Sequence, residues 1–145
     1  MRFVRVLTAA AMAWTMAVTF SATPTAQGKM SDEDFSKVMK AVGATSGSLR
    51  KNIEGQAADG IVADAKKMAD LMKTNMTFWT ERGNKEAADW AKGAMDAAAA
   101  IDKAATAKDM AAVSTEAKTL NSSCATCHMK NRERGADGTY SIKKG

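Results

Sequence analysis

Residues 109–128 read DMAAVSTEAKTLNSSCATCH, and this stretch decides how the chain is organised. Asp109 is a favourable N-cap residue at its start. Apolar side chains and two cysteines recur every three or four positions, which is typical of one helix face: Met110, Val113, Ala117, Leu120, Cys124 and Cys127. The stretch therefore predicts a last helix, ending near Arg132, whose core-facing side carries both cysteines.

The end of this stretch has the spacing C-x-x-C-H, which is the attachment signature of a c-type haem. Cys124 and Cys127 offer thiols to the two vinyl groups of one porphyrin, and His128 offers an imidazole to its iron. Residues at positions i, i+3 and i+4 of a helix share one face, so all three side chains can point at the same porphyrin. The motif predicts one covalent haem c, with His128 as an iron ligand.

Four other interpretations of the motif stay open. The chain contains two cysteines and one histidine, all of them in the motif, whereas a structural zinc site wants four such ligands. A thioredoxin-type C-x-x-C belongs beside a βαβ unit, and no convincing strand is visible. A disulfide between Cys124 and Cys127 would close a single helical turn and stabilise little. The motif could also be a chance occurrence with an ordinary surface histidine.

The N-terminal segment, residues 1–28, has the pattern of a secretory signal peptide. Arg2 and Arg5 precede the apolar run Val6–Phe20, and small and polar residues follow up to an expected cleavage site before Lys29. An uncleaved membrane anchor is the alternative, but a spanning helix needs about 20 apolar residues and this run is shorter. We expect export, to the periplasm if the cell is bacterial, with no stable membrane anchor after cleavage.

The exported part has the length of one domain and a modest positive charge. The leader carries two arginines and no acidic residue, so removing it lowers the net charge from +5 to +3. The charges are interspersed along helix faces and form no basic block, so we expect no nucleic-acid partner. No set of acid–base residues suggests a catalytic pocket, and we expect no enzymatic activity.

Apolar stripes and breaks predict an all-α, antiparallel up-down-up-down four-helix bundle over residues 29–134, with a covalently bound haem c. The polar segment 135–145 has no periodicity and is expected to be a flexible tail. Gly43 and Gly47 either let a flat, bulky group approach the first helix or are simply tolerated there. The stripes are rich in alanine, so we expect haem-free protein to fold poorly. The four helices are expected at 32–52, 57–79, 85–105 and 109–132.

Three segments resemble the cytochrome c-prime family, the class II c-type cytochromes: residues 38–44 (VMKAVGA), Trp90, and the C-x-x-C-H motif followed by Arg132. The resemblance covers roughly residues 32–134. Two positions depart from the family pattern. Phe35 stands where the family often has an arginine, and Asn131 stands where an aromatic residue usually precedes the arginine.

The resemblance implies a role for each candidate site residue. Cys124 and Cys127 would hold the haem, and His128 would be the proximal ligand. Met39 occupies the position that faces the distal side of the iron, where it either ligates the iron or packs as a core side chain. Arg132 either reaches the proximal pocket or a propionate, or is a solvated charge at the helix end.

The function expected from this resemblance is one-electron transfer with an unidentified redox partner protein. The alternative is a five-coordinate haem protein that binds nitric oxide or carbon monoxide. A peroxidase-like enzyme would want a distal proton-handling residue, and the chain has no second histidine. A small helical interaction module without haem is a further alternative. Family members often form homodimers through the first two helices, so a homodimer is also possible.

Overall fold

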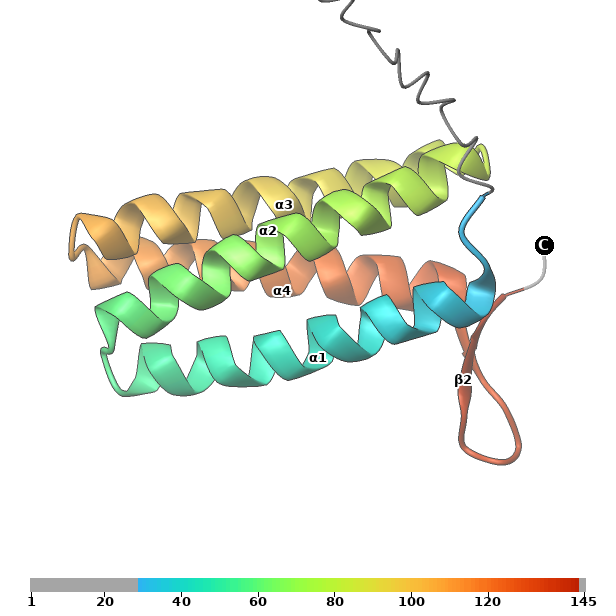
Figure 1. Cartoon of the computed structure of the whole chain (residues 1–145), viewed down its shortest axis with the longest axis horizontal. Coiled ribbons are helices and arrows are strands. Elements are labelled where there is room, and N and C mark those ends of the chain that lie inside the picture. The colour runs from blue at the N-terminus through green and yellow to red at the C-terminus, as the bar shows by residue number, and fades with distance from the viewer. Residues whose placement is uncertain (1–28, 144–145) are drawn as a thin grey trace, which may run out of the picture.

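A computed structural model describes residues 29–143. It contains four helices, each packed against the next in the chain, as in an up-down bundle (Figure 1). The prediction of an all-α four-helix protein is therefore confirmed, and the helix ends differ from the expected ones by two residues at most. The helices are α1 (Asp32–Glu54), α2 (Ala58–Glu81), α3 (Lys85–Thr106) and α4 (Met110–Asn131).

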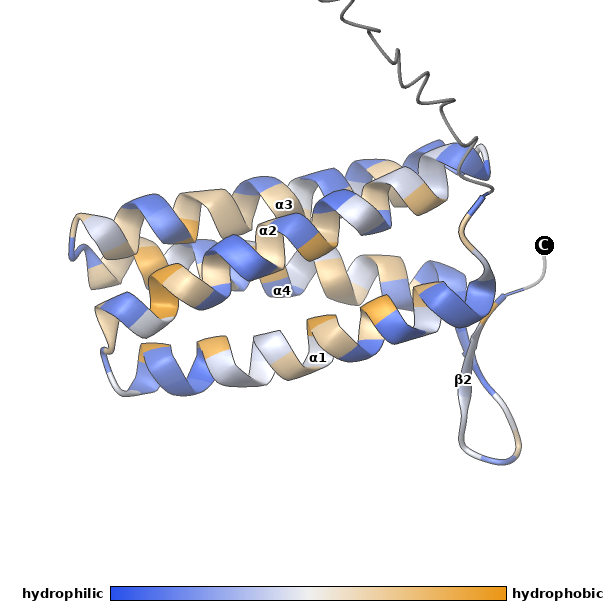
Figure 2. Ribbon diagram, viewed as in Figure 1, coloured by the Kyte–Doolittle hydropathy of each residue, from blue (hydrophilic) through white to orange (hydrophobic). Residues whose placement is uncertain are grey.

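The helices pack through two groups of buried side chains, with polar residues on the outer faces (Figure 2). The first group, here the main core, runs along the bundle and is rich in alanine from α3. It consists of Val42, Leu49, Ile61, Ala65, Met68, Met72, Ala94, Ala97, Ala98, Ile101, Ala105, Val113 and Leu120. The second, here the aromatic cluster, stacks Phe35 on Phe78 at 3.7 Å with Trp79 edge-on to both. The aromatic cluster consists of Phe35, Phe78, Trp79, Ala87 and Ala88.

The core face of α2 differs at one point from the stripe that its apolar spacing predicts, which is Ile61, Ala65, Met68, Met72, Met76 and Trp79. Asn75 and Phe78 are buried, whereas Met76, which the periodicity places in the stripe, is half-buried. An asparagine at a core position interrupts the apolar pattern. Periodicity therefore places the neighbouring Met76 on the core face instead of Asn75. Asn75 is one of only two buried polar residues in the described part of the chain, the other being Thr45.

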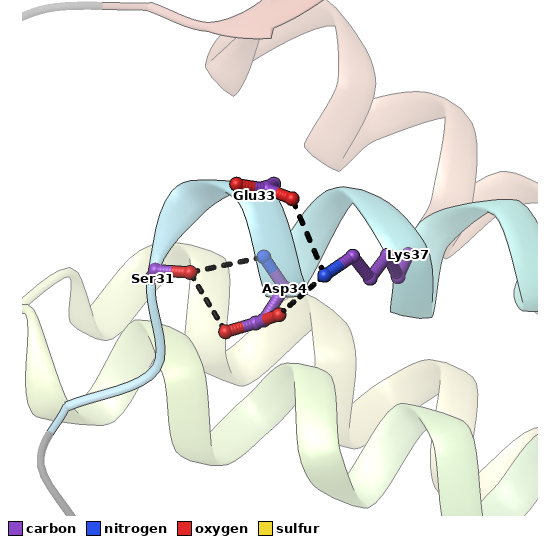
Figure 3. A network of polar contacts seen from close by, with 4 residues as sticks. All are labelled: Ser31, Glu33, Asp34 and Lys37. Atoms are coloured by element: carbon purple, nitrogen blue, oxygen red, sulfur yellow. Dashed lines mark hydrogen bonds and ion pairs between the residues drawn. The ribbon is translucent and has the colours of Figure 1, made fainter.

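Polar side chains fix where three of the helices begin. The Ser31 hydroxyl accepts a hydrogen bond from the Asp34 backbone N–H at 3.1 Å, and Lys37 donates to the Asp34 carboxylate at 2.9 Å (Figure 3). The bond from Lys37, and after it a bond from the Ser31 hydroxyl, lower the pKa of Asp34. The N-cap residues Asn84 and Asp109 accept from backbone N–H groups as Ser31 does.

One side of the bundle is much less closely packed than the others. Helices α1 and α2, α2 and α3, and α3 and α4 meet along their lengths, but α1 and α4 scarcely touch. Gly43 and Gly47 lie on α1, and a Cβ atom added to either would meet no other atom within 4 Å. No protein group approaches these glycines closely, so packing within the chain does not require them.

The chain after α4 forms a two-stranded hairpin, where the sequence predicted a flexible tail over 135–145. Strand β1 (Arg132–Arg134) pairs antiparallel with β2 (Tyr140–Ile142). The Asp137 carboxylate accepts from the Thr139 N–H at 3.0 Å, and Gly138 adopts a φ of +81° that favours glycine. Glycine and short polar residues are typical of hairpin turns as well as of disordered tails, and the flexibility expected of residues 135–145 stays a prediction.

No helix in the described part of the chain is both long and apolar enough to cross a membrane. The proposed signal peptide, residues 1–28, lies outside the described residues, as do the last two residues of the tail.

Candidate functional site

The three residues of the C-x-x-C-H motif, Cys124, Cys127 and His128, lie in the last turns of α4. The Cys124 side chain packs against the main core, and the Cys127 side chain packs against the aromatic cluster. Both cysteines are free thiols, and both are half-buried, as is His128. The structure thus places the two thiols on the side of α4 that meets the core, as the helical spacing predicted.

The electrostatics of both thiols favour the neutral form. Burial raises the pKa of Cys124 and of Cys127. The motif also sits near the C-terminal end of its helix, where the partial negative charge of the helix dipole disfavours a thiolate. Reactive and redox-active cysteines have lowered pKa values and often lie at helix N-termini. This geometry therefore argues against a thioredoxin-type site.

His128 is in the form that binds iron. Burial lowers its pKa, and the positive charge of Arg132 lowers it further. The imidazole is therefore neutral at pH 7, and a neutral imidazole keeps the nitrogen lone pair that a metal requires.

Met39 lies on α1 and packs against both groups of buried side chains. Met39 and Cys127 therefore both pack against the aromatic cluster, although they come from opposite ends of the chain. The Met39 sulfur accepts a hydrogen bond from the Asn75 side-chain amide at 3.5 Å. This contact orients the thioether. The only sequence feature that indicates the contact is Asn75 itself, a polar residue on the apolar face of α2.

Three buried polar atoms of α1 and α2 have no hydrogen-bond partner in the described part of the chain: Thr45 Oγ1, Asn75 Oδ1 and Trp79 Nε1. Each unsatisfied buried group costs about 1–3 kcal/mol, and ordered water is a common partner for such groups. The fit to haem rests instead on the donor set of the motif, which is two thiols and a neutral imidazole on the half-buried face of α4.

Asn131 connects the Cys127 turn to two other parts of the fold. Its side-chain amide donates to the Cys127 carbonyl at 3.2 Å and makes a longer contact of 3.8 Å with the Cys127 sulfur. Its side-chain oxygen accepts from Asn84 at the start of α3, at 3.0 Å. Its backbone carbonyl accepts from the Lys143 N–H of the hairpin at 2.9 Å. In the sequence, Asn131 stands out only as a departure from the family pattern.

The hairpin segment caps three of the carbonyl groups at the end of α4, including the Asn131 carbonyl that accepts from the Lys143 N–H. The Arg132 N–H donates to the His128 carbonyl, and the Lys143 ammonium donates to the Met129 carbonyl at 3.0 Å. The last four carbonyls of a helix otherwise have no partner in the helix. The hairpin therefore supplies partners for the end of the helix that carries the C-x-x-C-H motif.

Replacing Asn131 with alanine is expected to destabilise the protein by about 1–2 kcal/mol, because the Cys127 carbonyl and the Asn84 amide both lose a partner. Urea unfolding followed by circular dichroism measures this change. Asn121→Ala is the matched control, since Asn121 is exposed on the same helix and alanine favours helix formation there. Equal changes in the two variants would contradict the role given to Asn131.

Arg132 does not enter the core. It is exposed at the end of α4, and its guanidinium lies 4.0 Å from the centre of the Tyr140 ring on the hairpin. Its position fits the solvated alternative better than a buried contact in the proximal pocket, although its charge still acts on the pKa of His128.

Within residues 29–143, no three His, Cys, Asp or Glu side chains come together as a candidate metal-ion site, so a zinc site at the motif finds no further ligands there. Comparison of the chain with protein-family models, with curated proteins and with solved structures gives no match.

Proposed function

We propose that this chain is an exported c-type cytochrome of the class II, cytochrome c-prime type, and that it transfers single electrons. One observation carries the proposal. The C-x-x-C-H motif places two neutral thiols and a neutral imidazole on the half-buried face of α4, in a bundle whose α1 and α4 scarcely touch.

In this proposal Cys124 and Cys127 would hold the haem covalently, and His128 and Met39 would bind its iron. When bound, haem c supplies an iron that accepts and releases one electron, and a methionine ligand raises its reduction potential. Two ligands that stayed bound in both oxidation states would leave little to reorganise on each electron transfer.

A five-coordinate protein that binds nitric oxide or carbon monoxide is the second candidate. The hydrogen bond from Asn75 to the Met39 sulfur favours it, because a thioether held by Asn75 is less free to turn toward the iron. In that case Met39 is a packing residue, and the distal side is open to a diatomic gas.

The pattern of residues 1–28 supports export to the periplasm. The redox partner is proposed to be another protein, and a homodimer stays a prediction of the family resemblance. We propose no enzymatic activity, because the chain has a single histidine and the proposed haem uses it as a ligand.

Visible absorption spectra of the oxidised and dithionite-reduced holoprotein, with and without carbon monoxide, test the proposal. Sharp, split bands on reduction and no response to carbon monoxide are expected for iron bound by His128 and Met39. Broad bands that shift with carbon monoxide would overturn Met39 ligation and favour the gas-binding alternative. A protein with no haem bands at all would contradict both.

A further inference from the structure

We propose that the C-terminal hairpin is the surface on which this protein docks an acidic redox partner protein. The role of this surface in electron transfer rests on the proposed function. The surface itself follows from the charge and exposure of the hairpin.

All of the net positive charge of the exported chain lies at its C-terminal end. Residues 29–127 contain 14 basic and 14 acidic side chains, whereas residues 128–145 contain five basic and two acidic ones. The surplus of three positive charges thus begins after His128 and continues through the hairpin. Charge concentrated beside the proposed iron ligand attracts a partner of opposite sign to the place where electrons would leave.

The face of the hairpin that carries Tyr140 presents two arginines. Arg134 pairs with Tyr140 across the strands, and Arg132 lies two residues earlier on β1, so the three share one face. The guanidinium groups of Arg132 and Arg134 lie 4.0 Å and 5.8 Å from the Tyr140 ring centre. Stacking on the ring leaves the N–H edges of a guanidinium available to a carboxylate, which arginine binds in bidentate fashion.

These basic groups are not neutralised by the fold. Lys130, Arg132, Arg134 and Lys143 are all exposed, and none forms an ion pair with another group among residues 29–143. The acidic residues at the start of α1, which lies at the same end of the bundle (Figure 1), do have partners. Asp32 pairs with Arg82 at 2.6 Å, and Glu33 and Asp34 pair with Lys37.

The exposed apolar side chains point to a protein rather than to small ions. Tyr140 is 55% exposed and Met129 is 70% exposed, and they are the only large apolar side chains so exposed in the described part of the chain. Both fall in the same C-terminal segment as the unpaired basic groups. Tyrosine, methionine and arginine are enriched at protein interfaces.

Binding of poly-L-glutamate to the holoprotein, measured by calorimetry at low and at physiological ionic strength, tests the surface. The variant is R132Q/R134Q, and the matched control is K66Q/K67Q, which removes the same charge from two exposed positions of α2. We expect R132Q/R134Q to bind about tenfold more weakly than wild type, the control to change by less than about twofold, and salt to weaken wild-type binding. If R132Q/R134Q does not fold, R134Q alone is the variant to use, because the Arg134 side chain makes no hydrogen bond or ion pair within residues 29–143 and its loss should not disturb the fold. We expect R134Q to weaken binding as well, but by a smaller factor.

Two results would overturn the proposal. Equal losses in the variant and the control would mean that only net charge matters. Unchanged binding together with an altered haem spectrum in R132Q/R134Q would mean that the arginines hold the haem propionates instead. The measurement does not depend on haem absorbance. A protein that lacks haem but binds poly-L-glutamate through the arginines would contradict the proposed function while leaving the docking surface in place.

Discussion

The double variant C124S/C127S, produced together with a haem-attachment system, is expected to carry no covalent haem. A serine hydroxyl does not add to the porphyrin vinyl groups as a thiol does, so the haem is extracted when the protein is unfolded in acid and organic solvent. The measurement is haem absorbance that stays with the chain after this extraction. Loss should be complete in the double variant, and either single variant should keep one thioether bond.

Loss of the haem should also weaken the fold, because the main core is rich in alanine and a bound haem would supply buried apolar surface. We expect the melting temperature of C124S/C127S to fall by more than about 10 °C, equivalent to a few kcal/mol in a domain of this size. Ala125→Ser is the control, since Ala125 is exposed within the motif and this change leaves both thiols in place. A haem-free chain that melts cooperatively near the holoprotein temperature would refute this account of the core.

The second large effect is expected from Met39→Ala. If the Met39 thioether binds the iron, its removal converts a six-coordinate, low-spin protein into one whose reduced spectrum shifts on adding carbon monoxide. The reduction potential should fall, because a methionine ligand favours the ferrous state. Absorption spectra and a potentiometric titration measure the two changes.

Met76→Ala is the matched control for Met39→Ala. Met76 is also half-buried and also packs against the aromatic cluster, but it lies on α2. Both substitutions remove a side chain from the same region, so both should cost stability, on the order of 1–3 kcal/mol. Only Met39→Ala is expected to open the iron to carbon monoxide. The same response in both variants, or in the wild type, would show that Met39 is a packing residue.

Sequence periodicity predicted the helices well because each signal was local. Ser31 and Asp109 are N-caps in the structure, and Val113 and Leu120 are buried on α4 as their spacing indicated. The attachment motif was equally local, since its three residues lie within five positions of one helix. A helix fixes which of its residues share a face, so the structure places both cysteines on the core side as predicted.

The missed features depend on contacts between distant segments. Asn131 becomes important only because α4, the start of α3 and the hairpin come together around it. Asn75 occupies an apolar position of α2 because the Met39 sulfur of α1 lies beside it. The strands of the hairpin are three residues each, and β1 is entirely charged, so the segment is too short and too polar to show the alternation by which strands are predicted. A sequence pattern within one segment does not indicate contacts between distant segments.

The most direct test of the central claim is the intact mass of the wild-type protein, unfolded by acid, after production in cells that export it and attach haem. The account predicts the mass of the chain from Lys29 plus one haem. The unmodified mass, or a mass lower by the two hydrogens of a Cys124–Cys127 disulfide, would contradict covalent haem attachment and with it the proposed cytochrome.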